Sequence, residues 1–334
     1  MTATARPRSP LTPPLARIQM PVRAGLDQVS EEMVRIVVTD TPLIGEVSRH
    51  LLGMKGKMFR PTLVLLASQV DESPTSRAAT LGAVVELIHL ATLVHDDSVD
   101  HSVLRRGMPT VNALFSHQIS VIMGDFLYSR ALLELVRLRD LESLGVLAKA
   151  SNEMTLGEMR QLALNDPLAF SEEDYNLLIR AKTASLMSAA CEVGALCGAS
   201  GHRAALARFG EAMGMAFQIA DDLLDYTAEK ETTGKPTGLD LREHKVTLPL
   251  IAALRTMGAP ARAEVDSFFA ASEPEDAAVA RIVEIVSEEG GLEYARARGD
   301  EYVAEAEEAL DRLPASEATS ALRSAIAYVM ERHS

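Results

Sequence analysis

The 334-residue sequence predicts an all-α fold, a single large antiparallel helical bundle. Long apolar stretches with helical spacing recur along the chain, as in LIHLATLVH and MGMAFQIA. Residues that start and stop helices bound several of these stretches. Runs of alternating β-branched residues joined by Asn-Gly or Asp-Gly turns, which are typical of hairpins, are absent from the sequence.

The first elements follow from composition and capping residues. Residues 1–22 are rich in Pro, Thr and Arg and lack periodicity, so we expect a disordered lead-in there. One helical domain should then occupy residues 23–334. Thr41 and Pro42 form an N-cap with proline at the first helical position, and Gly53 closes that helix. Ser73-Pro74 opens a helix that runs to Asp100.

Later boundaries are marked in the same way. Residues 171–174 read Ser-Glu-Glu-Asp, the form of a capping box. Gly290-Gly291 ends a helix, and Pro314 precedes the last one. From about residue 258 the sequence is more polar. These signals predict many helices in one domain.

Composition excludes several classes of function. The net charge is −14, which argues against a nucleic-acid partner. We find no apolar stretch long enough to span a bilayer and no signal peptide at the start. Cys191 and Cys197 lack zinc-ligand spacing, so we expect buried, reduced thiols and a cytoplasmic protein.

Two acidic clusters with identical spacing, Asp96-Asp97-x-x-Asp100 and Asp221-Asp222-x-x-Asp225, are the main candidates for chemistry. Positions i and i+4 share a helix face, so the first and last aspartates of each cluster project together. Clustered carboxylates suit a hard cation such as Mg²⁺, which also holds waters and substrate phosphates. The alternative is a solvated acidic face, but both clusters have apolar surroundings, which favours the metal interpretation.

Basic groups near each cluster predict a polyanionic ligand. Arginine binds phosphate through two hydrogen bonds, and lysine acts as a point charge. Gln218 lies one turn before Asp221, where it could bind an anion or serve only in helix packing. His89 could equally be a core residue or a ligand, and His95 and His101 flank the first cluster. The basic candidates are Lys57, Arg60, Arg105, Arg106, Lys182 (followed by Thr183), Lys235 and Lys245.

With these motifs the chain resembles the all-trans polyprenyl (isoprenyl) diphosphate synthases, over roughly residues 25–330. The segments that carry the resemblance are GKMFRP, ELIHLATLVHDDSVDHSVLRRGMPTVN, GDFLYSRA, AKTA and FQIADDLLDYTAEKETTGKPTGLDLREHKVTLPLI. The resemblance implies the isoprenoid synthase fold, a helical bundle around a central cavity. It also implies a homodimer.

The resemblance assigns the candidate residues to two substrates. Magnesium, three ions per active site, would be held by Asp96, Asp100 and Asp221, with Asp97, Asp222 and Asp225 as supporting or direct ligands. The residues implied for the allylic diphosphate are Arg105, Lys182, Thr183, Gln218, Lys235 and Lys245. Those implied for isopentenyl diphosphate are Lys57, Arg60, His89 and Arg106.

The implied reaction is condensation of isopentenyl diphosphate with an allylic diphosphate, giving a trans polyprenyl diphosphate. The allylic carbon–oxygen bond ionises, and the developing charge on the leaving group is stabilised by magnesium and basic side chains. No protein nucleophile is required, and in the family the released pyrophosphate is the proposed base. We therefore assign no residue as catalytic base or nucleophile.

Residues before the first cluster bear on product length. In the family, bulky aromatics four or five residues before the cluster stop elongation early. Here those positions are Thr92 and Ala91, and Ile88 lies one turn further back, so we expect a medium or long product. A tunnel floor could instead come from a facing helix, whose candidates are Met123, Phe126, Leu127 and Leu132.

Three departures and three alternatives stand beside this interpretation. Residues 55–57 read Lys-Gly-Lys where the family often has paired glycines, and His244 stands where the family often has glycine. In addition, the C-terminal residues 331–334 are not a clear basic tail. The main alternative is a short-chain farnesyl or geranylgeranyl diphosphate synthase. A non-catalytic partner subunit and a terpene cyclase are disfavoured, because both clusters and all basic groups are present and Asp225 replaces the serine of a cyclase motif.

Overall fold

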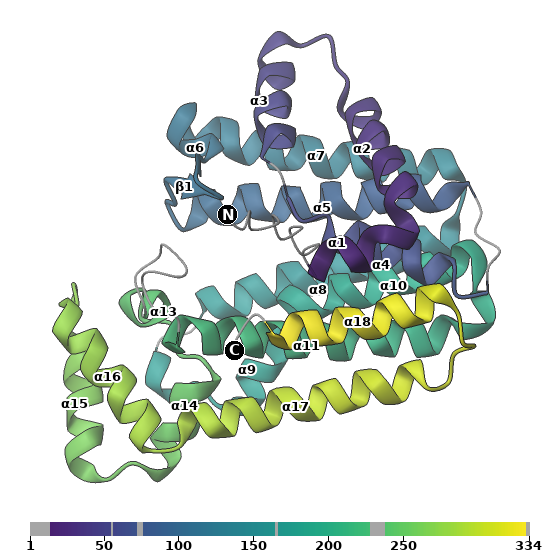
Figure 1. Ribbon diagram of the computed structural model, residues 1–334. Helices are drawn as coiled ribbons and strands as arrows, with labels where there is room; N and C mark the ends of the chain where they lie inside the picture. The colour runs from purple at the N-terminus through teal and green to yellow at the C-terminus, as the bar shows by residue number, and fades with distance from the viewer. Residues whose placement is uncertain (1–13, 55, 72–75, 164–165, 228–237, 332–334) are drawn as a thin grey trace, which may run out of the picture.

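The computed structural model describes residues 14–54, 56–71, 76–163, 166–227 and 238–331. Nearly all of these residues lie in helices, so the all-α prediction is confirmed (Figure 1). The first half comprises α1 (Pro14–Gln19), η1 (Met20–Val22), α2 (Arg23–Val37), α3 (Pro42–Gly53), α4 (Phe59–Ser68), α5 (Arg77–Val99), β1 (Leu104–Arg105), β2 (Met108–Pro109), α6 (Val111–Leu114), α7 (His117–Leu138) and α8 (Leu141–Leu162).

The second half comprises η2 (Pro167–Ala169), α9 (Glu172–Ile179), η3 (Arg180–Ala184), α10 (Ser185–Gly198), η4 (Ser200–His202), α11 (Arg203–Thr227), α13 (Leu239–Arg242), α14 (Leu248–Thr256), α15 (Ala259–Ala270), α16 (Asp276–Glu288), α17 (Gly291–Leu310) and α18 (Glu317–Glu331). Helix α10 packs against α4, α5, α8 and α11, so it lies at the centre of the bundle. Helix α5 also packs on α7, and α11 packs on α17. The two helices that carry the aspartate clusters, α5 and α11, are therefore separated by α10.

Several local predictions are confirmed. Helix α3 begins at Pro42 and ends at Gly53, although the Thr41 side chain makes no capping hydrogen bond. The capping box at Ser171 and Asp174 is complete, with hydrogen bonds in both directions. Gly290 takes a φ of 75° between α16 and α17, a conformation that glycine adopts without steric cost. The predicted helix start at Ser73-Pro74 lies outside the described residues, and α5 is described from Arg77.

The prediction of a disordered lead-in is wrong for residues 14–22, which form α1 and η1. Ile18 and Val22 are 2% and 1% exposed and belong to the main hydrophobic core. Burial of these two side chains holds a segment whose composition alone does not predict a helix. Residues 1–13 lie outside the described residues.

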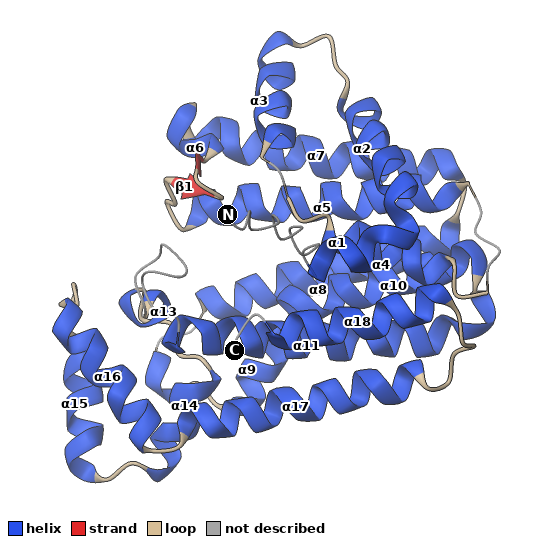
Figure 2. Ribbon diagram, in the orientation of Figure 1, coloured by secondary structure: helices blue, strands red, loops and turns tan. Residues whose placement is uncertain are grey.

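A short strand pair was also not predicted. Strands β1 and β2 pair Leu104 with Pro109 and Arg105 with Met108 (Figure 2). The two turn residues, Arg106 and Gly107, have φ of 52° and 75°, which is the pattern of a tight hairpin turn. The turn directs Arg105 and Arg106 to different partners.

Helix α5 is long and apolar enough to cross a membrane, contrary to the expectation that no stretch reaches that length. In the structure 72% of its most apolar 18-residue window is buried in the protein. The core helix of a bundle passes the same test of length and composition, so this finding is weak evidence for a membrane span.

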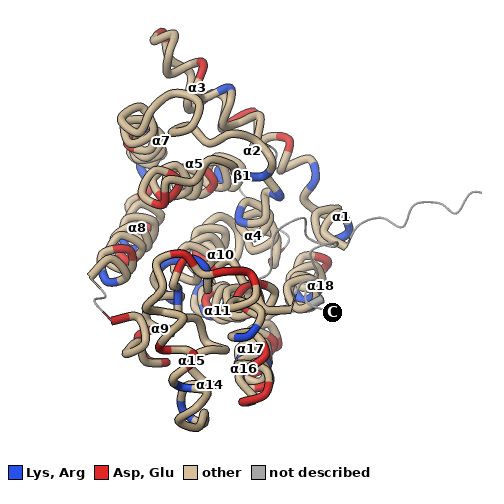
Figure 3. Tube along the Cα trace, turned by 90° about the vertical axis from the view of Figure 1, so that its left-hand side faces the viewer, with Lys and Arg blue, Asp and Glu red and all other residues tan. Residues whose placement is uncertain are grey.

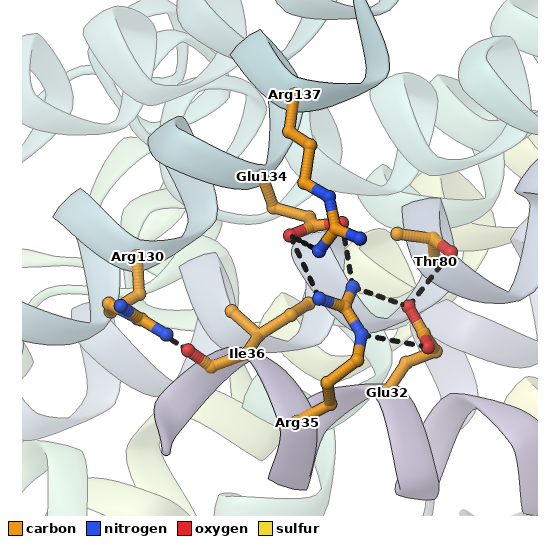
Figure 4. Close-up of polar contacts among 7 residues, drawn as sticks. All are labelled: Glu32, Arg35, Ile36, Thr80, Arg130, Glu134 and Arg137. Atoms are coloured by element: carbon orange, nitrogen blue, oxygen red, sulfur yellow. Dashed lines mark hydrogen bonds and ion pairs between the residues drawn. The ribbon is translucent and has the colours of Figure 1, made fainter. Parts of the chain in front are cut away.

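An ion-pair cluster ties the N-terminal helices to the bundle (Figure 4). Arg35 of α2 donates to Glu134 of α7 at 2.6 Å and to Glu32 at 2.7 Å. Thr80 of α5 donates to Glu32 at 2.9 Å, and Arg137 lies 3.6 Å from Glu134. Glu134 is largely buried, so its two arginine partners offset the cost of removing the carboxylate from water.

Candidate active site

The first aspartate cluster occupies the last turn of α5, and its members have different surroundings. Asp97 is 5% exposed, and Arg105 of β1 donates from Nε to both carboxylate oxygens at 2.8 Å. Within the described part of the chain, no side chain donates a hydrogen bond to the carboxylates of Asp96 or Asp100. Asp97 therefore anchors the hairpin, whereas Asp96 and Asp100 remain available to a ligand.

Helix α8 and the π-helical turn η3 face this cluster. Lys182 donates from Nζ to Glu158 at 2.7 Å and to Gln161 at 3.0 Å. Burial, together with the nearby Glu158 and Asp100 carboxylates, raises the pKa of Asp96 to about 6, and Lys182 acts in the opposite direction. A π-helical turn often marks a functional position, because it shifts the register of the side chains that follow. Here it brings Lys182 toward Asp96.

The second cluster lies near the end of α11, and its aspartates also have different surroundings. Asp222 is 4% exposed and accepts hydrogen bonds from the Tyr175 hydroxyl at 2.6 Å and from Gln218 Nε2 at 2.9 Å. Thr183 in turn donates to Gln218 at 2.8 Å. Burial and the neighbouring Asp240 raise the pKa of Asp222 well above its usual value.

Asp225 and Asp221 complete the second cluster. Asp225 accepts from the backbone N–H groups of Leu239 and Asp240, both at 3.0 Å, and so caps α13. The side chain of Asp221 is exposed and makes no hydrogen bond within the described residues. Burial and Asp225 raise the pKa of Asp240 to about 7.

Lys245 follows α13 and lies close to acidic groups of two segments. Its Nζ donates to Glu243 at 2.6 Å, and its backbone N–H donates to the Asp240 carbonyl at 2.8 Å. Burial lowers the pKa of Lys245, but Glu243, Asp100 and Asp240 together raise it above its usual value. Asp100 belongs to the first cluster on α5, so this lysine lies near that cluster as well as near Asp240, whose backbone N–H is bound by Asp225 of the second cluster. In Figure 3 acidic segments mark α5, α8 and α11.

The residues assigned to isopentenyl diphosphate also lie together. Arg60 Nη1 lies 3.1 Å from His89 Nε2. Burial, together with Arg60 and Arg106, lowers the pKa of His89 well below its usual value, so the neutral ring accepts this hydrogen bond. A Cβ on Gly56 would lie 2.6 Å from the Arg106 guanidinium, so the absence of a side chain there makes room for it. Lys57 Nζ lies 5.8 Å from the centre of the Tyr328 ring.

The donor set fits a hard divalent cation. Asp96, Asp100 and Asp221 offer carboxylates without hydrogen-bonding partners in the described residues, whereas Asp97, Asp222 and Asp225 are held by protein donors. Across the described ranges, no three His, Cys, Asp or Glu side chains converge closely enough to hold an ion alone. Magnesium commonly completes its coordination with waters and substrate phosphates, so such an open arrangement suits it.

Other predicted residues lie as follows. Ile88 and Ala91 are each 2% exposed, Thr92 is half-buried, and their lining of a product tunnel stays a prediction. Of the facing-helix alternatives, Leu132 is exposed on α7. Lys235 lies outside the described residues. His95 contacts the Val121 carbonyl at 3.2 Å and lies 3.4 Å from Asp125, so its known partners are on α7.

Sequence reasoning missed four residues at the site: Tyr175, Glu158, Asp240 and Glu86. Asp240 had a sequence signal, because it lies between two lysines already singled out. Tyr175 had none, because 47 residues separate it from Asp222. Glu86 is 4% exposed, one turn before His89, and its carboxylate is close enough to Arg60 and Arg106 to offset their charges.

Comparison with known proteins gives consistent matches. A sequence profile of the family described as polyprenyl synthetase matches residues 41–286. Heptaprenyl diphosphate synthase component 2 of Geobacillus stearothermophilus is 37% identical, over 92% of this chain and 95% of its own. A decaprenyl diphosphate synthase structure from Rhodobacter capsulatus superposes with a TM-score of 0.90, at 35% identity, over 96% of this chain and 99% of its own. The structure of a polyprenyl synthase from Caulobacter crescentus, complexed with calcium and isoprenyl diphosphate, superposes with a TM-score of 0.89. It is 33% identical in sequence, and the match covers 98% of this chain and 100% of its own.

Proposed function

The chain belongs to the polyprenyl synthetase family, and we infer that it is a polyprenyl diphosphate synthase, a prenyltransferase that elongates an allylic diphosphate with isopentenyl diphosphate. The reaction breaks the bond between the allylic carbon and its diphosphate oxygen. It forms a carbon–carbon bond to the terminal alkene carbon of isopentenyl diphosphate, which then loses a proton. The observation that carries this function is the pair of aspartate clusters on α5 and α11, with Lys182 and Lys245 beside them.

The side chains divide into two groups that suit two diphosphates. Lys182, Thr183, Gln218 and Lys245 lie between the clusters, where they would bind the allylic diphosphate as its negative charge develops. Arg60, His89 and Arg106 form a second, buried basic group that would hold isopentenyl diphosphate. Because neutral His89 accepts a hydrogen bond from Arg60, it fixes the direction of that guanidinium.

We propose magnesium as the metal, held by Asp96, Asp100 and Asp221 and three ions per site. When bound, it supplies positive charge to the leaving diphosphate oxygens. The related Caulobacter crescentus protein was crystallised with calcium and isoprenyl diphosphate, which supports a divalent cation beside a diphosphate. Asp97, Asp222 and Asp225 would orient the metal-binding aspartates through Arg105, Tyr175 and α13.

A direct assay tests this function. The protein is incubated with labelled isopentenyl diphosphate, Mg²⁺ and each allylic starter, and product mass is measured. Elongation in Mg²⁺ that stops on chelation is the expected result. Asp96→Asn and Asp221→Asn should each lower kcat by about a hundredfold, because each removes one cation ligand. No elongation with any starter would overturn the assignment.

The product is a medium- or long-chain trans polyprenyl diphosphate, in line with the heptaprenyl and decaprenyl relatives. A short-chain farnesyl or geranylgeranyl product is the alternative, and product mass in the same assay separates the two. Helix α5 carries Ala91 and Thr92 rather than aromatic residues before its cluster, which supports the longer product.

We propose that two copies pair through the exposed face of α7. The large apolar side chains exposed on that helix are Val121, Ile122, Tyr128, Leu132, Leu133 and Val136. The name of the Geobacillus stearothermophilus relative, component 2, raises the alternative of a different partner subunit. Light scattering of the purified chain should give the mass of two copies, and Leu133→Glu should give the mass of one. An active wild-type monomer would contradict the dimer.

We also propose that the enzyme acts in the cytoplasm. Its two cysteines, Cys191 and Cys197, are buried and form no disulfide, as is usual for proteins of a reducing compartment. Burial raises the pKa of the Cys191 thiol far above its usual value, so it stays protonated. Cell fractionation with antibody detection would test the compartment, and recovery outside the cytosolic fraction would contradict it.

A further inference from the structure

The loop between α13 and α14 contains a backbone conformation that its sequence makes unusual. His244 has a φ of 53°, in the left-handed region that glycine adopts without steric cost. Histidine is among the few other residues found there with some frequency. Since Lys245 follows directly, the conformation of His244 sets the direction in which the chain presents that lysine.

Two phenylalanines of α15 hold the His244 ring. The ring centre lies 5.5 Å from that of Phe269, in an edge-on arrangement, and 6.0 Å from that of Phe268. The two phenylalanine rings are themselves 5.5 Å apart. The Nε2 atom of His244 is buried and has no hydrogen-bond partner among the described residues. The ring is therefore placed by aromatic packing rather than by a polar contact.

The same helical hairpin, α15–α16, also contacts α13 and its N-cap residue. Arg242 donates to Asp276 of α16 at 2.8 Å. A Cβ on Gly238 would lie 2.4 Å from Cγ1 of Val279 on α16, so the Val279 side chain packs directly on the Gly238 backbone. The start, middle and end of residues 238–244 thus contact one hairpin. Figure 1 shows α15 and α16 side by side at one end of the molecule, near α13 and α14.

The contacted segment, residues 238–245, carries groups from the candidate active site. Its Asp240 N–H donates to Asp225 of the second cluster, and Lys245 is close to Asp100 of the first. The hairpin itself contributes no residue to the aspartate clusters or to the basic groups around them. Its contacts with residues 238–244 are a direct connection between residues 259–288 and the site.

We propose that the α15–α16 hairpin positions Lys245 for the allylic diphosphate, and that His244 acts as a positioning residue through its ring contacts with Phe268 and Phe269. This inference rests on the proposed function, because it takes the ligand of Lys245 to be a diphosphate. Loss of the ring contacts should leave the loop folded but less restricted. The allylic diphosphate would then bind more weakly, while the isopentenyl diphosphate site on α4 and α5 stays unchanged.

Steady-state kinetics of His244→Gly, His244→Asn and Phe269→Leu test the proposal. Glycine and asparagine both accept the left-handed conformation, so these variants remove the ring without straining the backbone. Each variant should raise KM for the allylic diphosphate about tenfold, with KM for isopentenyl diphosphate unchanged. Phe269→Tyr keeps the ring and should behave like the wild type. Arg262→Ala, which removes an ion pair with Asp266 of the same helix at 2.9 Å, is the matched control and should also leave both KM values unchanged.

The outcomes separate this proposal from the proposed function. An inactive wild-type protein would overturn the proposed function. An active wild type whose His244→Gly and Phe269→Leu variants keep the wild-type KM for the allylic diphosphate would overturn the positioning role alone. A parallel rise in both KM values, together with a lower melting temperature, would show a general structural effect and would also overturn it.

Discussion

Replacing Tyr175 with phenylalanine removes one hydroxyl group and leaves the ring in place. That hydroxyl donates to Asp222 at 2.6 Å, and the two side chains are 2% and 4% exposed. Asp222 also accepts from Gln218, which in turn accepts from Thr183. The substitution therefore removes one end of a chain of hydrogen bonds that reaches the allylic diphosphate site.

The size of the effect follows from burial. Leaving a buried hydrogen-bonding group without its partner costs roughly 1–3 kcal/mol, so we expect the free energy of unfolding to fall by about 2 kcal/mol. Burial already raises the pKa of Asp222, and the Tyr175 hydroxyl acts to lower it. Without the hydroxyl the pKa should rise further, and the Asp222 carboxyl group should lose its fixed orientation.

Urea unfolding and steady-state kinetics measure the two consequences. The urea midpoint should fall, and kcat/KM for the allylic diphosphate should fall about tenfold because Gln218 and Thr183 are less well placed. KM for isopentenyl diphosphate should not change, since Arg60 and His89 lie on other helices. Tyr226→Phe is the matched control, because the buried Tyr226 hydroxyl has no hydrogen bond of normal geometry in the described residues.

Two results would refute this reasoning. One is an equal loss of activity in the Tyr226→Phe control, which would show that any change near Asp222 has the same effect. The other is a Tyr175→Phe variant that keeps the wild-type kcat/KM while its urea midpoint falls. That result would show that the hydrogen bond from Tyr175 to Asp222 has only a structural role.

Three further predictions concern other parts of the molecule. Ala91→Tyr should shorten the product, because a ring one to two helical turns before the first cluster would block elongation; unchanged product mass would contradict the tunnel assignment. Glu134→Gln should lower the unfolding free energy by about 2 kcal/mol, because Arg35 and Arg137 lose their shared carboxylate; the exposed Lys149→Ala should leave the urea midpoint unchanged. The pKa of Asp240 is about 7 in the folded protein, against 3.8 for the same group in an unfolded chain, so Asp240 stabilises the fold when it is protonated. With a chelator present to remove metal ions, this contribution of roughly 4 kcal/mol to the unfolding free energy should be present at low pH and lost as pH rises through 7. Asp240→Asn should weaken the dependence of the unfolding free energy on pH. If the wild type and the variant show the same dependence, this prediction is wrong.

The features that were correctly read from the sequence are local ones. The helix from Pro42 to Gly53 and the capping box at Ser171 depend on residues within one or two turns of each other. The i, i+4 spacing of the aspartates is likewise a property of a single helix. Such patterns are readable because the groups that interact are neighbours along the chain.

The features that were missed depend on distant partners. Residues 14–22 form helix because Ile18 and Val22 pack into the core. Asp222 is held by Tyr175, 47 residues away, and no spacing rule connects the two. The short β1–β2 hairpin turns on Arg106-Gly107, which is not among the common hairpin dipeptides.

By itself the sequence determined an all-α chain with two carboxylate clusters, nearby basic residues and the segments of one enzyme family. Only the tertiary structure decided which aspartates are held by hydrogen bonds from the protein and which have no such partner among the described residues. All six cluster residues are aspartates, and Asp225 even has the same position in its cluster as Asp100, but the partners of Asp97, Asp222 and Asp225 come from β1, α9 and α13. A side chain's chemistry depends on what surrounds it, and those surroundings are assembled from segments that the sequence keeps far apart.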